Sequence, residues 1–121
     1  MKHQICWIEV ATPNAPATRD FFSKVFGWNM EASPAMPDYH IYDPGAGPMG
    51  AIHGYMQNGP SMTAYIYAPD IEAKLAEVEA AGGKVLAKKM FINDAVGNIA
   101  HFADPNGNKF GLWDRERYGQ P

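Results

Sequence analysis

The stretch Asn98–Asp114, NIAHFADPNGNKFGLWD, decides the fold, and its centre predicts a tight turn. Pro105 presets its φ for the first central position of a turn, and Gly107 can adopt a positive φ. A three-residue loop closed by a glycine bulge at Gly107 pairs Asp104 with Asn108. We therefore expect one β-hairpin whose register is set by its turn.

This register separates the side chains of the hairpin onto two faces. Side chains alternate along a strand, so Phe102 lies opposite Phe110, and His101 lies opposite Gly111 on the other face. The phenylalanine face is apolar and suits a core. The second face carries His101, Trp113 and a glycine that leaves space, which is typical of the floor of a pocket.

Composition limits the classes of partner. A chain of 121 residues, 46% of them hydrophobic, suits a single domain over residues 1–121 with a real core. The formal net charge of −3, without a basic cluster, argues against nucleic acid. The only cysteine, Cys6, excludes an internal disulfide. Because no apolar run approaches the roughly 20 residues of a membrane span and no signal peptide is evident, the expected location is cytoplasmic.

The order of elements is expected to occur twice. Asn14 is a good N-cap for a helix at residues 15–26, and Asp70 caps a second helix that ends near residue 81. One strand precedes each helix and three follow it: residues 4–11, then 28–32, 39–43 and 49–56; residues 62–68, then 84–88, 99–103 and 109–113. Aligning the two caps gives two βαβββ units, about 3–58 and about 61–115.

This order predicts an α+β fold, in which two βαβββ units form a curved, cup-like mixed sheet with the helices on the outer face. Each helix covers one face of its sheet, so the opposite face can line a cup. Alternation along the strands gives the residues expected in the cup: Trp7, Glu9, Thr63, Tyr65, Tyr67, His101 and Trp113, with His53 as a further candidate.

Four short motifs accompany this pattern. They are ICWxExxT at 5–12, FxxVFGW at 22–28, AGG at 81–83 and ADPNGNxFGL at 103–112. Together they resemble the vicinal oxygen chelate superfamily, which contains glyoxalase I, bleomycin-resistance proteins and extradiol dioxygenases, and most closely its short glyoxalase-like members. The resemblance covers nearly the whole chain, and it implies the paired βαβββ fold and a homodimer.

The resemblance also implies where metal ligands would lie. Metal-dependent members place four His, Gln or Glu ligands, on the first and last strand of each unit. The corresponding positions here hold Trp7, Thr63 and Gly111, and His53 is the candidate for the fourth. A catalytic divalent metal needs about three protein ligands, so we expect neither a metal nor another cofactor.

Glu9 and His101 are the candidate catalytic residues. Glu9 is an acid or base, a counter-ion for a cationic ligand, or a carboxylate held by an internal partner such as Tyr65 or Lys109. His101 is a general base or ligand contact, or else a histidine satisfied by a neighbouring backbone group or tyrosine.

The other candidates are residues for ligand contact, and most are aromatic: Trp7, His53, Thr63, Tyr65, Tyr67 and Trp113. Their rings either stack on a planar or cationic ligand or simply fill the cup. A metal triad of His53, Glu9 and His101 has suitable ligand types, but nothing in their spacing brings them together.

These patterns favour a glyoxalase-like protein without the family metal site that binds a partly aromatic organic ligand, in a sequestration or resistance role. The alternative is a metal-independent lyase or isomerase in which Glu9 and His101 transfer protons next to a carbonyl. The expected partners are the small ligand and a second copy of the chain, with neither nucleic acid nor membrane. Aromatic surface at Phe21, Phe22 and Trp28 supports the homodimer.

Overall fold

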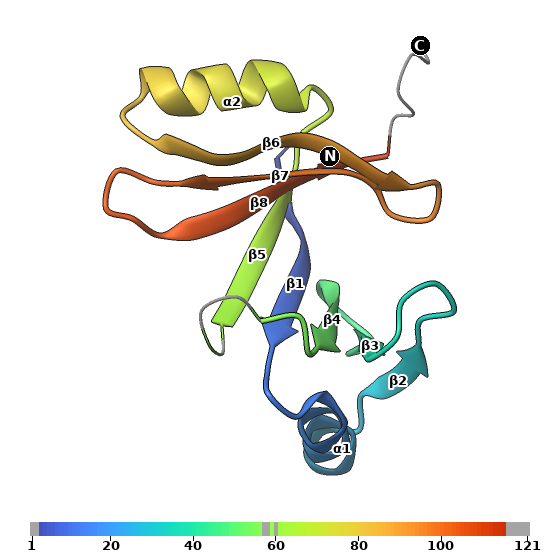
Figure 1. Cartoon of the computed structure of the whole chain (residues 1–121). Helices are drawn as coiled ribbons and strands as arrows, with labels where there is room; N and C mark the ends of the chain where they lie inside the picture. Colours follow the sequence, from blue (N-terminus) through green and yellow to red (C-terminus); the bar gives the residue numbers. More distant parts are fainter. Residues whose placement is uncertain (1–2, 57–58, 60, 116–121) are drawn as a thin grey trace. The chain divides into compact units, whose positions relative to one another are not determined.

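A computed structural model describes residues 3–56, 59 and 61–115 of the chain. Its strands are β1 (Ile5–Ala11), β2 (Asn29–Ala32), β3 (Tyr39–Asp43), β4 (Met49–His53), β5 (Ser61–Tyr67), β6 (Lys84–Asn93), β7 (Gly97–Ala103) and β8 (Lys109–Asp114). Its helices are α1 (Ala15–Phe26) and α2 (Ile71–Ala80). The βαβββ order therefore occurs twice, as predicted (Figure 1).

The chain divides into two compact units. The N-terminal unit is Cys6–Thr63, and the C-terminal unit combines Met1–Ile5 with Ala64–Pro121. Each unit has a four-stranded mixed sheet and one helix, which confirms the predicted α+β class and the paired βαβββ units. That residues 1–121 form a single domain, and that the two sheets line one cup, stay predictions.

The sheet of the N-terminal unit has the order β2-β3-β4-β1, with β1 parallel to β4 and the other pairs antiparallel. Asn14 begins α1 because its side chain accepts a hydrogen bond from the Ala17 backbone N–H at 3.1 Å. The core beneath α1 is built around Ala15, Tyr42 and Ile52. These contacts fix which face of the sheet the helix covers.

The sheet of the C-terminal unit has the order β5-β8-β7-β6, with β5 parallel to β8 and the other pairs antiparallel. Helix α2 lies along one face of this sheet (Figure 1). Asp70 caps α2 through the Ala73 backbone N–H at 3.0 Å. The core between helix and sheet contains Ile71, Leu75 and Leu112.

The hairpin between β7 and β8 has the predicted turn and register. The Asp104 backbone N–H donates to the Asn108 carbonyl at 2.9 Å, and Gly107 has φ 87°. Phe102 pairs with Phe110, and their rings stack with centroids 5.6 Å apart. The turn residues were therefore enough to predict the register of β7 against β8, and with it the face on which each side chain of the hairpin lies.

Strand β6 is longer than predicted. It continues past residue 88 to Asn93, and three shifts of register interrupt its pairing with β7. Met90 pairs with Ile99 and Phe91 with Asn98 despite these shifts. Bulges of this kind break the strict alternation from which a strand is read in a sequence.

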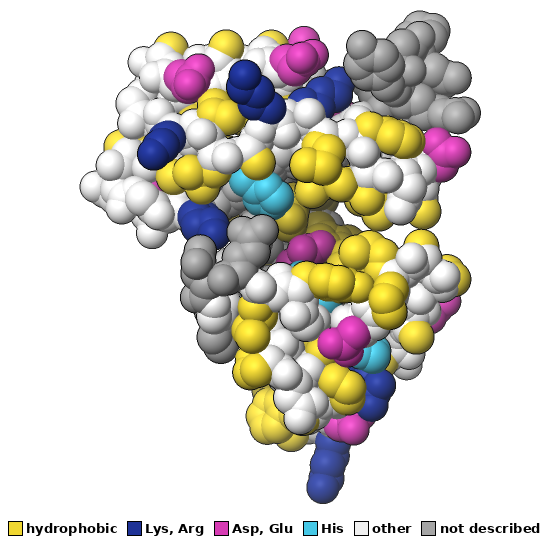
Figure 2. Space-filling model, in the orientation of Figure 1, with side chains coloured by type: hydrophobic (Ala, Val, Ile, Leu, Met, Phe, Trp, Pro, Cys, Tyr) yellow, Lys and Arg dark blue, Asp and Glu magenta, His cyan; other side chains and the backbone are white. Residues whose placement is uncertain are grey.

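Only part of the aromatic surface around α1 belongs to the core. The Phe22 ring stacks on Trp28, and Trp28 stacks on Tyr42, with centroids 4.9 and 4.6 Å apart. Phe21 and Phe26 are instead 55% and 60% exposed, and apolar side chains reach the surface elsewhere too (Figure 2). The homodimer stays a prediction.

No helix among the described residues is long and apolar enough to span a bilayer.

Candidate functional site

The N-terminal unit has an open face, which we define as the face of its sheet opposite α1. Trp7 and Glu9 of β1 lie on this face, because Val10 packs against the core on the helix side and neighbouring residues of a strand point to opposite faces. The strand registers place Tyr39 opposite His53 across β3 and β4. The same registers bring these side chains to one region of the open face.

The Glu9 carboxylate is the centre of this region. The Tyr39 hydroxyl donates to Glu9 Oε2 at 2.7 Å, and the Trp7 indole N–H donates to the same oxygen at 3.2 Å. His53 Nε2 lies 3.2 Å from Glu9 Oε1. Three side chains from three strands therefore hold one carboxylate in place.

The backbone fixes the proton on His53. The Tyr55 backbone N–H donates to His53 Nδ1 at 3.1 Å, so Nδ1 is an acceptor and carries no proton. The neutral ring must then carry its proton on Nε2, and it donates that proton to Glu9. The Tyr39 ring stacks on the imidazole with centroids 5.5 Å apart, which holds the ring in this orientation.

These contacts set the charge of Glu9. Burial raises the pKa of the Glu9 carboxyl, but hydrogen bonds from His53, Tyr39 and Trp7, together with the charge interaction with His53, outweigh it, so the pKa lies below the ordinary value of 4.5. Glu9 is consequently an anion at neutral pH.

The open face of the C-terminal unit, opposite α2, carries a second polar pair. The Tyr65 hydroxyl and His101 Nε2 share a hydrogen bond of 2.8 Å across β5 and β7. The Tyr65 ring lies directly over Gly111, where a Cβ atom would come within 2.3 Å of the ring carbons. The space that the sequence assigned to a pocket floor is thus occupied by the Tyr65 ring.

Tyr67 and Trp113 form an aromatic pair on the same face. Their ring centroids are 5.9 Å apart, and the Trp113 indole N–H donates to the Val96 carbonyl. The Arg115 guanidinium lies 5.9 Å from the Trp113 ring centroid. Thr63 is half-buried on β5.

The structure brings the predicted site residues together in three groups. Trp7, Glu9 and His53 meet in the N-terminal unit, while Tyr65 meets His101 and Tyr67 meets Trp113 in the C-terminal unit. These groups show which candidates touch one another, and their roles toward a ligand stay predictions.

Sequence reasoning missed Tyr39, and it named other internal partners for Glu9. The alternation of residues 39–43 puts Tyr39 on one face with Ile41, but the register of β3 against β4 depends on a loop whose geometry the sequence does not specify. His40, on β3 beside Tyr39, is buried and lies 3.2 Å from the Asp38 carboxylate.

The side chains at the family's metal-ligand positions are poor ligands for a metal. The Trp7 indole is a donor only and binds Glu9, and Gly111 has no side chain beneath Tyr65. No three His, Cys, Asp or Glu side chains in the part of the chain that the structure describes form a metal-binding group. These donors do not fit the four-ligand pattern, and the absence of a metal or other cofactor stays a prediction.

Two βαβββ units, each with one helix-covered and one open face, define a protein of the vicinal oxygen chelate superfamily. The chain belongs to the glyoxalase-like domain family, whose family model matches residues 7–113.

Two curated relatives and one solved structure illustrate the similarity. The "Putative glyoxylase CFP32" of Mycobacterium tuberculosis is 27% identical over 93% of this chain and 46% of its own length. The anthracycline biosynthesis protein DnrV of Streptomyces peucetius is 28% identical over 88% of this chain and 45% of its own length. The chain thus spans less than half the length of these relatives.

A Mn(II)-bound glyoxalase from Novosphingobium aromaticivorans has the same fold. It superposes with a TM-score of 0.71 at 18% identity, over 93% of this chain and 38% of that chain. At this identity the likeness concerns the fold alone.

The charge of Glu9 predicts a pH-dependent stability. Because folding lowers the pKa of Glu9, its contribution is fully present above the ordinary value of 4.5 and is lost as the pH falls through the folded value. We expect Glu9→Gln to lower the free energy of unfolding at neutral pH by about 1–2 kcal/mol. Urea unfolding from pH 7 downward should show that the difference in unfolding free energy between the unsubstituted chain and Glu9→Gln becomes smaller in acid. A difference that does not change with pH would contradict the lowered pKa of Glu9.

The contact between Tyr65 and Gly111 predicts a strong coupling. Gly111→Ala should cost about 1–3 kcal/mol of unfolding free energy, because its Cβ atom displaces the Tyr65 ring. In a Tyr65→Ala background the same change should cost less than about 0.5 kcal/mol. A double-mutant cycle measured by urea unfolding provides the check, and additive losses would show that the two residues are not in contact.

Proposed function

We propose that the chain binds a small, partly aromatic organic molecule without a bound metal, and that it acts by sequestering this ligand. The proposal rests above all on the Glu9 carboxylate, which is ionised and held between Trp7 and Tyr39 on the face that α1 leaves uncovered. Ligand sites combine aromatic surface with a few fixed polar groups of this kind.

The charge of Glu9 favours binding over proton transfer. A general base is most effective when its pKa is near the working pH, whereas the contacts of Glu9 hold its pKa below the ordinary value. Such a carboxylate is a weak proton acceptor and stays ionised at neutral pH. It is better suited to orienting a ligand than to catalysis.

The names of the relatives are compatible with this proposal. DnrV is named for the biosynthesis of anthracyclines, which are organic compounds. An aromatic ligand is the class that Trp7 and Tyr39 would accommodate by stacking.

The binding proposal is tested by a thermal-shift screen of aromatic compounds, followed by titration of the hits. Trp7→Ala should weaken binding by about 1–3 kcal/mol, because stacking area is lost. Phe21→Ala is the matched control, because it removes an exposed ring from α1 on the other side of the sheet. Equal affinities of the Trp7→Ala variant and the unsubstituted chain would show that the ligand does not bind at Trp7 on this face.

The second candidate function is a metal-independent lyase or isomerase that uses Glu9 and His101 for proton transfer. It is favoured by the 2.8 Å hydrogen bond between Tyr65 and His101, because a phenol and an imidazole can exchange a proton.

For any substrate that the chain converts, His101→Ala should lower kcat by about 100-fold or more, the usual contribution of a general acid or base. The pH dependence of kcat should also lose one ionisation. Turnover that is unchanged in this variant would exclude His101 as the catalytic residue.

A further inference from the structure

We propose that the ligand is an organic cation whose ammonium group binds beside Glu9 on the open face of the N-terminal unit. This inference rests on the proposed function and names the chemical class of its ligand. It follows from the charge, the aromatic neighbours and the exposure of Glu9.

Within the part of the N-terminal unit that the structure describes, Glu9 has no Lys or Arg partner. Indole and phenol are uncharged donors, so Trp7 and Tyr39 satisfy the carboxylate oxygens without neutralising them. His53 Nε2 lies 3.2 Å from Glu9 Oε1, and the Tyr55 backbone N–H donates to His53 Nδ1 and orients the ring. A largely buried carboxylate without a Lys or Arg partner can bind the positive group of a ligand.

The N-terminal unit supplies no Lys or Arg side chain to this face. Arg19 and Lys24 are the only Lys or Arg residues between positions 6 and 63 of the sequence, and both lie on α1. Arg19 is also paired with Asp20 at 2.8 Å. Both positive charges therefore belong to the helix-covered side of the sheet.

The same face carries further acidic side chains. Glu9, Ala51, Ile41 and Glu31 form one row across the sheet, because each pairs with the next. Asp43 lies two residues along β3 from Ile41 and shares its face. Three carboxylates from this unit thus make the open face anionic, which raises the local concentration of cations.

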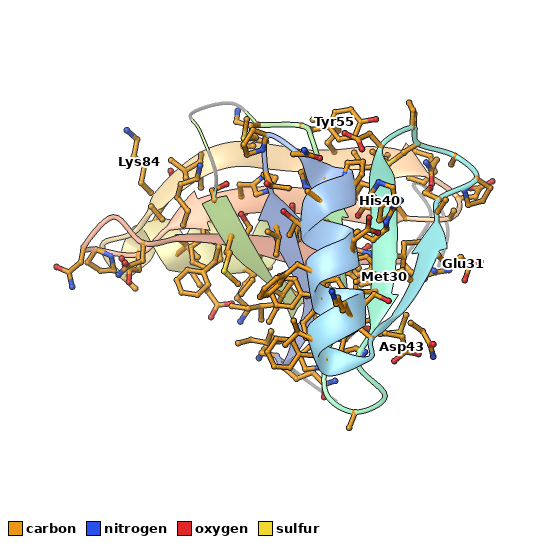
Figure 3. The ribbon with its side chains drawn as sticks, turned by 90° about the horizontal axis from the view of Figure 1, so that it is seen from below. Met30, Glu31, His40, Asp43, Tyr55 and Lys84 are labelled. Carbon is orange, nitrogen blue, oxygen red and sulfur yellow. The ribbon has the colours of Figure 1, made fainter. Side chains whose placement is uncertain are left out.

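A cavity of about 240 Å³ opens beside this row. Its lining combines carboxylates with apolar side chains: Asn29, Met30, Glu31, Ile41, Asp43 and Met49. Figure 3 shows Met30, Glu31 and Asp43 along β2 and β3. Strands lie about 4.8 Å apart, which places the Glu31 backbone about 14 Å from that of Glu9. One small ligand contacts Glu9, while the carboxylates of the cavity act on it through their field.

The neighbours of Glu9 favour an organic cation over a metal ion. A metal ion requires several oxygen ligands, and both Glu9 oxygens already accept hydrogen bonds. An ammonium group needs only one carboxylate oxygen and an aromatic face, which Trp7 and Tyr39 provide. The Glu9 side chain keeps 21% of its surface exposed, enough for such a contact.

The test compares two probes with the same aromatic body, benzylammonium and benzyl alcohol. Each is titrated at low salt and neutral pH, and the indole N–H resonance of Trp7 is followed by ¹H–¹⁵N NMR. This resonance, assigned with Trp7→Phe, reports directly on the Glu9 contact. We expect benzylammonium to bind at least about tenfold more tightly than benzyl alcohol, and this preference to fall at high salt.

Glu9→Gln should abolish the preference, with the Kd of benzylammonium raised about tenfold and that of benzyl alcohol unchanged. Asp20→Asn is the matched control: it removes the same charge from α1, and it should leave the preference intact. If Glu9→Gln fails to give a folded spectrum, the salt dependence in the unsubstituted chain decides the question.

Equal binding of the two probes at Trp7 would overturn the cation inference and leave the proposed function standing. Binding of neither probe would also overturn the inference, whereas the proposed function fails only if the full aromatic screen yields no ligand at Trp7. A preference that survives Glu9→Gln would show that another group binds the ammonium.

Discussion

The register of the β7–β8 hairpin is the constraint on which the C-terminal unit depends. The bulge at Gly107 places Gly111 opposite His101, and the parallel pairing of β5 with β8 places Tyr65 beside Gly111. A side chain at position 111 would collide with the Tyr65 ring, so the glycine allows the ring to lie flat on the strand. The Tyr65 hydroxyl then reaches His101. One turn thereby determines the polar pair on the open face.

Local interactions account for what could be predicted from the sequence. The caps Asn14 and Asp70 bind N–H groups three residues away, and the turn that begins at Asp104 closes within four. Strand alternation then assigns each side chain to a face without knowledge of its partner. The repeated βαβββ order and the composition of both open faces follow from such short-range rules.

Non-local pairing accounts for what could not be predicted. Tyr39 reaches Glu9 only because β3 pairs with β4 and β4 with β1 in particular registers, and no turn residue reports those registers. The extension of β6 to Asn93 depends on bulges that break its alternation. The sequence also does not show that Phe22 is stacked on Trp28 while Phe21, its neighbour on α1, is exposed.

The hydrogen-bond partners of Glu9 carry the proposal that this face binds a ligand. The charge of a carboxylate paired with Arg or Lys is largely balanced by that partner. Uncharged donors such as indole and phenol orient a carboxylate without balancing its charge. Trp7 and Tyr39 supply both hydrogen bonds and aromatic surface, so the groups that hold Glu9 also form part of the surface a ligand would touch. The same hydrogen bonds lower the pKa of Glu9 and weaken it as a base. Fixing the anion and making it a poor proton acceptor are therefore one physical effect, and this effect favours binding over catalysis.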